Sequence, residues 1–212
     1  MPSPRPLYLT VFFACASPSA RVQSPVQTSP QHDVLSAAYG FADGGHYSYD
    51  GAGAPEDILV AGEQIVAADP NGTHCSGFTF AVAMRAARQR NLLAGFTADR
   101  LRGFQREWYG SAGDIERQAG PAMERLGIGT LVSEAGAQSG DFVQFWRGRT
   151  GHSAVFLGFV IEGGKKVGLR YRSSQGSTDG ISDKTEFFAD TPYANGEVLR
   201  HRTYFARLSP PR

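Results

Sequence analysis

Cys75 and His152 are the residues whose types and settings are best suited to covalent chemistry. Cys75 lies in the motif Gly-Thr-His-Cys-Ser-Gly, immediately before an apolar segment, and His152 opens the apolar segment Gly-His-Ser-Ala-Val-Phe-Leu. At the start of a helix, the positive end of the helix dipole favours the thiolate form of a cysteine. A histidine is a suitable base for such a thiol. The pair therefore predicts a nucleophile and a base that the fold must bring together.

A third polar group is expected to orient the imidazole. Residues 170–175 read Arg-Tyr-Arg-Ser-Ser-Gln, and alternation along a strand places Tyr171, Ser173 and Gln175 on one face. An amide oxygen can accept a hydrogen bond from an imidazole N–H. We therefore predict that Gln175 is the third member of the site, with Ser173 as the alternative.

Simpler interpretations of the same residues stay open. A lone cysteine can be a buried, inert residue that packs as a small hydrophobe, although its neighbours His74 and Ser76 favour partial exposure of Cys75. His152 can be a surface histidine in a turn. His74 is next to the thiol but is a poor candidate for the base, because adjacent residues of a helix do not face each other.

Neither a metal nor a cofactor is expected. The histidines do not have metal-ligand spacing, and a single cysteine with scattered histidines does not make a zinc site. The segment Gly-Ile-Gly at 127–129 lacks the third glycine of a dinucleotide fingerprint. The 21 basic and 20 acidic residues nearly cancel, which gives no electrostatic reason to expect nucleic acid or an anionic membrane as a partner.

The beginning of the chain has the pattern of an export signal. Arg5 precedes an apolar run of ten residues, 7–16, which is too short to span a bilayer. Ala-Cys-Ala at 14–16 resembles a cleavage site; lipidation at Cys15 and a cytosolic tail are the alternatives. We predict a signal peptide over 1–20, a flexible linker over 21–33, one domain over 34–212, and a periplasmic or extracellular protein.

Apolar spacing predicts that helices precede strands. The helices are expected over residues 56–68, 75–90, 98–108 and 121–126. After Gly140, β-branched and aromatic residues predict strands over 141–146, 153–161, 167–174 and 198–208, with a hairpin turn at Gly163 and Gly164. This order indicates an α+β fold in which N-terminal helices pack on an antiparallel sheet.

Three of these motifs together resemble the NlpC and CHAP families of cell-wall peptidases and amidases. The motifs are Cys-Ser-Gly-Phe at 75–78, Gly-Asp-Phe-Val at 140–143 and Gly-His-Ser-Ala-Val at 151–155, and the resemblance extends over about residues 56–208. It implies a papain-like fold and hydrolysis of an amide bond, usually in peptidoglycan peptides, through a thioester on Cys75. It also implies that the backbone N–H of Cys75 donates to the oxyanion, with Gln64 as a second donor.

The sequence departs from that family pattern in three places. His74 replaces the usual acid before the cysteine. The hairpin after residue 161 is longer than usual, so Gln175, Ser173 and Arg172 all stay candidates for the third catalytic group. A long insertion also separates the cysteine helix from Gly140. Two other functions therefore stay open beside a cysteine hydrolase: an inactive module that binds the wall or a partner, and an acyltransferase. The oligomeric state is open as well.

Overall fold

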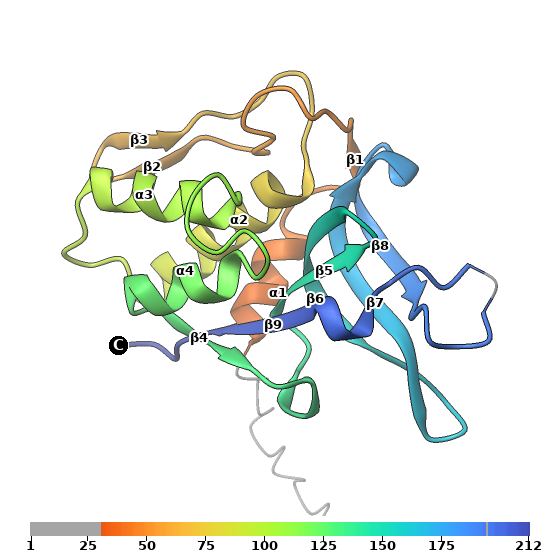
Figure 1. The fold of residues 1–212 in the computed structure, drawn as a ribbon. Helices are drawn as coiled ribbons and strands as arrows, with labels where there is room; N and C mark the ends of the chain where they lie inside the picture. Colours follow the sequence, from red (N-terminus) through yellow and green to blue (C-terminus); the bar gives the residue numbers. More distant parts are fainter. Residues whose placement is uncertain (1–30, 194) are drawn as a thin grey trace, which may run out of the picture.

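A computed structural model describes residues 31–193 and 195–212, and within them helices gather on one side of a curved sheet (Figure 1). The helices are α1 (His32–Tyr39), α2 (Cys75–Gln89), α3 (Ala98–Trp108) and α4 (Ala119–Leu126). The architecture is α+β, as predicted. The predicted signal peptide and most of the predicted linker lie outside the described residues, and α1 begins inside the range assigned to the linker.

The main sheet has seven strands in the order β1-β8-β7-β6-β5-β9-β4, and every neighbouring pair is antiparallel. Its strands are β1 (Gly44–Gly45), β4 (Gly129–Val132), β5 (Phe142–Arg147), β6 (Thr150–Glu162), β7 (Lys165–Gln175), β8 (Gly180–Phe187) and β9 (Thr203–Leu208). A separate hairpin joins β2 (Ile58–Val60) to β3 (Glu63–Val66).

Each face of the main sheet carries its own apolar cluster. The helix-facing cluster unites buried residues of α1 to α4 with Phe142, Val155 and Ala206 of the sheet. The other face carries a second, more aromatic cluster, whose buried members are Val143, Phe145, Ala154, Phe156, Leu169, Tyr171, Phe188, Val198 and Phe205. Neighbouring residues along β5 and β6 fall in different clusters because side chains alternate across a strand.

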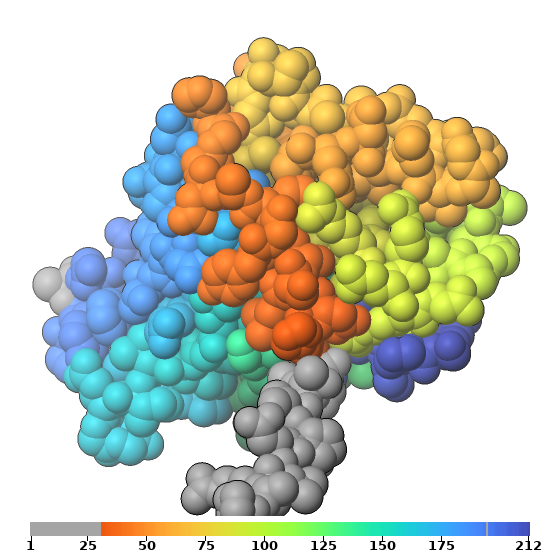
Figure 2. Space-filling view, turned by 180° about the vertical axis from the view of Figure 1, so that it is seen from behind, coloured from red at the N-terminus to blue at the C-terminus, as the bar shows by residue number. Residues whose placement is uncertain are grey.

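The first described segment joins the two halves of the molecule. From behind, α1 lies along the boundary between the helices and the sheet (Figure 2). Two buried arginines hold it there: Arg90 of α2's C-terminal end bonds Asp33, and Arg172 of β7 donates to the backbone oxygens of Ala38 and Phe41. Arg172 is thereby engaged on the helix-facing side.

Several predicted elements are confirmed, one is wrong, and the strand predicted over 198–208 begins only at Thr203, after a 3-10 turn over Arg200–Arg202. The helices over 75–90 and 98–108 are present as α2 and α3, and Gly127 ends α4 in the left-handed conformation with φ of 78°. The helix predicted over 56–68 is instead the β2–β3 hairpin. Its chain reverses at Ala61 and Gly62, which have φ of 51° and 84° and cannot continue a right-handed helix.

Candidate functional site

The thiol of Cys75 lies at the first residue of α2, as predicted. His74 caps this helix, because its Nδ1 accepts a hydrogen bond of 3.2 Å from the backbone N–H of Gly77. Gly77 has no room for a side chain, since a Cβ there would lie 2.1 Å from the oxygen of Gly53. The loop before α2 therefore packs tightly against the helix start and sets the place of Cys75.

Cys75 is buried, with 8% of its surface exposed, so the predicted partial exposure is wrong. The residue nevertheless belongs to neither apolar cluster of the described structure. Its sulfur lies 3.9 Å from the hydroxyl of Ser76. Burial, followed by the hydrogen bond to Tyr49, raises the pKa of Tyr47, whose backbone pairs with Thr73 two residues before Cys75.

His74 is a structural residue at this helix start. Burial lowers its pKa, and its ring packs edge-on against Tyr109 with 5.5 Å between ring centroids. A neutral imidazole is the form that can accept the capping hydrogen bond at Nδ1. This arrangement agrees with the expectation that His74 is a poor candidate for the base.

Thr73 ties the start of α2 to the end of β7. Its hydroxyl donates to Ser174 Oγ at 2.7 Å, and Ser174 Oγ donates to the backbone oxygen of Thr73 at 3.0 Å. Thr73 also pairs with Tyr47 in an isolated parallel bridge. The nucleophile candidate therefore sits near the strand ends of the sheet, two residues beyond this polar link.

His152 lies on β6 in the aromatic cluster's face of the sheet. Its ring centroid is 5.3 Å from that of Phe145 and 5.6 Å from that of Tyr171. Only 5% of the residue is exposed, and its Nε2 is buried without a hydrogen-bond partner among the described residues. Burial, followed by the charge of Arg147, lowers its pKa to about 3, so the imidazole is neutral at physiological pH.

Gln175 ends β7 on the same face as Tyr171. The Tyr171 hydroxyl lies 2.9 Å from Gln175 Oε1, and 6% of Gln175 is exposed. The alternative third residue, Ser173, is engaged elsewhere: its hydroxyl donates to the backbone oxygen of Ser153 at 2.7 Å. Of the three candidates for this role, Gln175 is therefore the one that the structure brings to the surroundings of His152.

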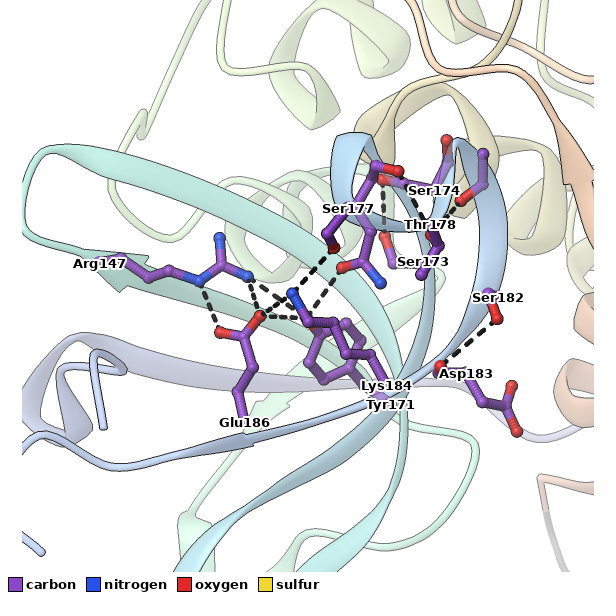
Figure 3. A network of polar contacts seen from close by, with 12 residues as sticks. Arg147, Tyr171, Ser173, Ser174, Ser177, Thr178, Ser182, Asp183, Lys184 and Glu186 are labelled. Carbon is purple, nitrogen blue, oxygen red and sulfur yellow. Dashed lines mark hydrogen bonds and ion pairs between the residues drawn. The ribbon is translucent and has the colours of Figure 1, made fainter. Parts of the chain in front are cut away.

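A cavity of about 390 Å³ unites His152 and Gln175. Its other lining residues are Tyr47, Tyr49, Arg147, Thr150, Gly176, Ser177, Lys184, Glu186 and Glu197. At its wall, Arg147 and Lys184 both pair with Glu186, and the Tyr171 hydroxyl joins them (Figure 3). Burial raises the pKa of Glu186, but the hydrogen bond and charge of Arg147 lower it to about 2, so this carboxylate is ionised.

The three predicted site residues are brought together only in part. His152 and Gln175 line one cavity, whereas Cys75 is not among its lining residues. Within the described chain, the sulfur has no hydrogen bond to either residue. The alternation of β6 places His152 on the face opposite α2. Tyr47 lies between the two places, because it lines the cavity and pairs with Thr73, two residues before Cys75.

The remaining predicted residue, Gln64, lies elsewhere. It is an exposed residue of β3, and its amide donates to Asp57 Oδ1 at 3.2 Å. The segment was expected to be helical, so its place in the fold was wrong as well. The backbone N–H of Cys75, the other predicted oxyanion donor, is at the start of α2 beside the thiol.

The charged wall of the cavity was not predicted. Arg147 ends β5, and Lys184 and Glu186 alternate along β8 toward one face. The sequence Ile-Ser-Asp-Lys-Thr-Glu at 181–186 has this strand alternation, which was the available signal. In the part of the chain that the structure describes, no group of three histidine, cysteine or acidic side chains is placed to hold a metal ion.

Comparison with known proteins gives no relative. No family model, curated protein or solved structure matches this chain. Among the described residues, no helix combines the length and apolar character needed to cross a membrane.

Proposed function

We propose that this protein is an exported cysteine hydrolase of papain-like fold, related to the NlpC and CHAP groups, that cleaves an amide bond in peptidoglycan peptides. Cys75 is the nucleophile, His152 the base and Gln175 the residue that orients the base. The observation that carries the proposal is the position of Tyr47, which pairs with Thr73, two residues before Cys75, and also lines the cavity of His152 and Gln175.

In this mechanism the Cys75 thiolate attacks the carbonyl carbon of the amide. The backbone N–H of Cys75 donates to the oxyanion, the C–N bond breaks, and His152 returns the thiol proton to the leaving amine. Water then attacks the thioester, releases the acid and restores the thiol. The neutral imidazole of His152 can accept a proton, but its lowered pKa makes it a weak base, so the dipole of α2 must supply part of the thiolate stabilisation.

The mechanism also requires a path for the proton between two faces of the sheet. The path can run around the end of β7. There Gly176 lies against Tyr47, since a Cβ on Gly176 would be 3.4 Å from the Tyr47 ring. Hydrogen bonds between catalytic groups are often long in the free enzyme and tighten when substrate binds. A movement of Tyr47 with bound peptide is the step that would bring the thiol and the cavity together.

A binding module on the same fold is the second candidate. The observations that favour it are the placement of His152 between two aromatic rings and the missing hydrogen bond between the thiol and His152 in the described residues. In this function the cavity holds a wall peptide or a partner without cleaving it. An acyltransferase differs from the hydrolase only in using an amine in place of water to resolve the thioester.

Alkylation of Cys75 separates a hydrolase from a binding module. The full chain carrying Cys15→Ser is treated with iodoacetamide at pH 6, and the modified peptide is quantified by mass spectrometry. A hydrolase should react faster than a free model thiol, and His152→Ala should slow the reaction about tenfold or more. His201→Ala, at an exposed histidine of the 3-10 turn Arg200–Arg202, is the matched control.

Turnover is tested with a peptidoglycan digest analysed for new amine and carboxyl ends. Cys75→Ala should abolish product formation while the protein stays folded. If wild type releases no product and its thiol reacts no faster than a model thiol, the binding module is the better description. Product that carries an added amine, in place of free acid, would identify an acyltransferase.

A further inference from the structure

The hydroxyl of Tyr171 has more acceptors around it than it has protons. It lies 2.8 Å from Glu186 Oε1 and 2.9 Å from Gln175 Oε1, and Arg147 Nη2 approaches it at 3.3 Å (Figure 3). A tyrosine hydroxyl donates one hydrogen bond and can accept others, whereas a carboxylate oxygen and an amide oxygen can only accept. One of the two short contacts therefore joins two oxygens with no proton between them.

Of the two acceptors, Glu186 should receive the hydrogen bond that the Tyr171 hydroxyl donates. Its carboxylate is ionised and already faces Arg147 and Lys184, and hydrogen bonds to a charged acceptor are about twice as strong as neutral ones. The Tyr171 oxygen then acts as acceptor for Arg147 and for one further donor. Gln175 can be that donor only if its Nε2, and not its Oε1, faces Tyr171.

A half turn of the Gln175 amide removes a second conflict at the same time. With Oε1 toward Tyr171, the Gln175 Nε2 is buried and has no partner among the described residues. An unpartnered buried donor is costly. The oxygen and nitrogen of an amide have nearly the same shape, so hydrogen bonding decides between the two orientations. The turned amide gives Nε2 a partner without displacing the backbone, and it moves Oε1 to the buried position at the cavity that Nε2 had occupied.

We propose that Tyr171, fixed by Arg147 and Glu186, is a positioning residue that makes Gln175 donate to it and present its carbonyl oxygen to the cavity beside His152. Tyr171 and Gln175 share a face of β7 because they are four residues apart in a strand. The β6–β7 pairing ends at Val155 and Arg172; the same register extended by three residues would set His152 opposite Gln175, and both residues line the same cavity. The amide oxygen is thus offered on the side where the imidazole lies.

The orientation decides what the cavity can hold. A carbonyl oxygen accepts from an imidazole N–H, which is the role that the proposed hydrolase requires of Gln175, or from an N–H group of a bound peptide. The same oxygen repels a carboxylate. The catalytic meaning of the inference rests on the proposed function, but the orientation of the amide and the preference for N–H groups do not.

Nuclear magnetic resonance on the full chain tests the orientation directly. In the wild type we expect a strong Overhauser effect between the Gln175 side-chain amide protons and the ring protons of Tyr171 next to its hydroxyl. We also expect the His152 ring to carry its proton on Nε2, read from long-range proton–nitrogen correlations. Absence of the Overhauser effect, or a proton fixed on Nδ1, would overturn the inference whether or not the protein hydrolyses anything.

Two variants and a control complete the test. Tyr171→Phe should speed exchange of the Gln175 amide protons about tenfold, the factor for one lost hydrogen bond of ordinary strength, and should mix the His152 tautomers. Gln175→Met should mix the tautomers as well. Tyr39→Phe is the control, because the Tyr39 hydroxyl bonds Asp183 away from the cavity. Unchanged tautomers in both variants, or equal changes in the control, would refute the positioning role.

Discussion

The two faces of the main sheet use polar side chains in different ways. On the helix-facing side, Thr73 and Ser174 are neutral, buried and bonded to each other. A charged residue on that side, Arg172, is buried and bonds backbone oxygens of Ala38 and Phe41. On the other side, Arg147, Lys184 and Glu186 form a charged group at the wall of a cavity. Among the described residues, His152 Nε2 and Gln175 Nε2 are buried without a partner at this cavity, and Gln144 Nε2 is buried without one on the helix-facing side.

The polar groups of the first side stabilise the packing of the helices, whereas those of the second side are available to a ligand. Helix packing on the first face excludes water, so polar groups there, apart from Gln144 Nε2, bond one another or the backbone. The second face keeps charges near a solvent-accessible cavity, where a ligand can engage them. Cys75 belongs to the first face by its helix and approaches the second through Tyr47, which is why its reactivity is the decisive measurement for function.

The largest effect is expected from the centre of the helix-facing side. Trp108 is fully buried, its Nε1 donates to Thr79 Oγ1 at 3.1 Å, and its ring lies 5.0 Å from that of Phe142. Trp108→Ala should lower the free energy of unfolding by about 4 kcal/mol, through lost burial and a cavity. Urea titration followed by circular dichroism measures the change.

Trp146→Ala is the matched control for that comparison. Trp146 is only partly buried, and its Nε1 donates to the backbone oxygen of Glu116 at 2.9 Å. Its loss should cost about half as much, because less apolar surface leaves water on folding. Equal costs for the two tryptophans would show that stability is not concentrated at the centre of the helix-facing side, because Trp146 lies on the same side of β5 as Phe142 but nearer its margin.

The next effect should be a dependence of stability on pH that arises on the cavity side. Burial and Arg147 lower the pKa of His152 from 6.5 to about 3, so below pH 6.5 the unfolded chain binds a proton that the folded chain does not. Stability is therefore lost as pH falls from 6.5 toward 3, by about 3 kcal/mol at pH 4. His152→Phe, which keeps an aromatic ring, should remove this loss.

Urea unfolding at pH 7, 5.5 and 4 checks this dependence on His152. His201→Gln, at an exposed histidine, should retain the wild-type loss of stability. A wild type whose stability does not fall more than that of His152→Phe over this range would show that the imidazole becomes protonated without unfolding. In that case His152 would be more open to water than its aromatic neighbours indicate.

The sequence predicts those elements whose local pattern agrees with their packing. Phe78, Val82 and Ala86 recur at helical spacing and are fully buried in α2. The hairpin of β2 and β3 was predicted as a helix because the apolar pairs at 58–59 and 65–66 are about two helical turns apart. The feature that distinguishes the hairpin from a helix is the turn at Ala61 and Gly62, where φ is positive at both residues.

The site was predictable to a similar degree. Alternation along β7 correctly grouped Tyr171 with Gln175, which meet through a short polar contact. Alternation alone did not reveal that His152 lies on the face opposite α2, because the sequence does not state which face the helices cover. The charged wall of Arg147, Lys184 and Glu186 was not predicted, because β8 is largely polar and no strand was predicted there.

A smaller effect is expected from the carboxylate of the charged wall. Burial acts to raise the pKa of Glu186, but Arg147 lowers it from 4.5 to about 2, so the folded chain keeps this group ionised at a pH where the unfolded chain protonates it. Its contribution is present above pH 4.5 and is lost as pH falls toward 2, by about 2 kcal/mol after allowance for partial exposure. Glu186→Gln should remove this acid-dependent part.

Acid unfolding between pH 5 and 2.5 measures the contribution of Glu186. Glu134→Gln is a suitable control, because Glu134 pairs with Arg200 at a distance from the cavity and is about one-third exposed. Its effect should be smaller, since exposed pairs contribute little. If both variants lose the same acid dependence, the charged wall is an ordinary surface ion pair.

The smallest effect should come from the neutral polar link beside Cys75. Thr73→Val removes one hydroxyl but leaves a hydrogen bond from Ser174 Oγ to the backbone oxygen of residue 73, so it should cost about 1 kcal/mol. The double variant Thr73→Val with Ser174→Ala should cost less than the sum of the single changes, because the two hydroxyls satisfy each other. The rate at which iodoacetamide modifies Cys75 gives a second readout. An unchanged rate in the double variant would mark the link as purely structural, whereas a changed rate would show that the strand ends, and not the helix alone, set the position of the thiol.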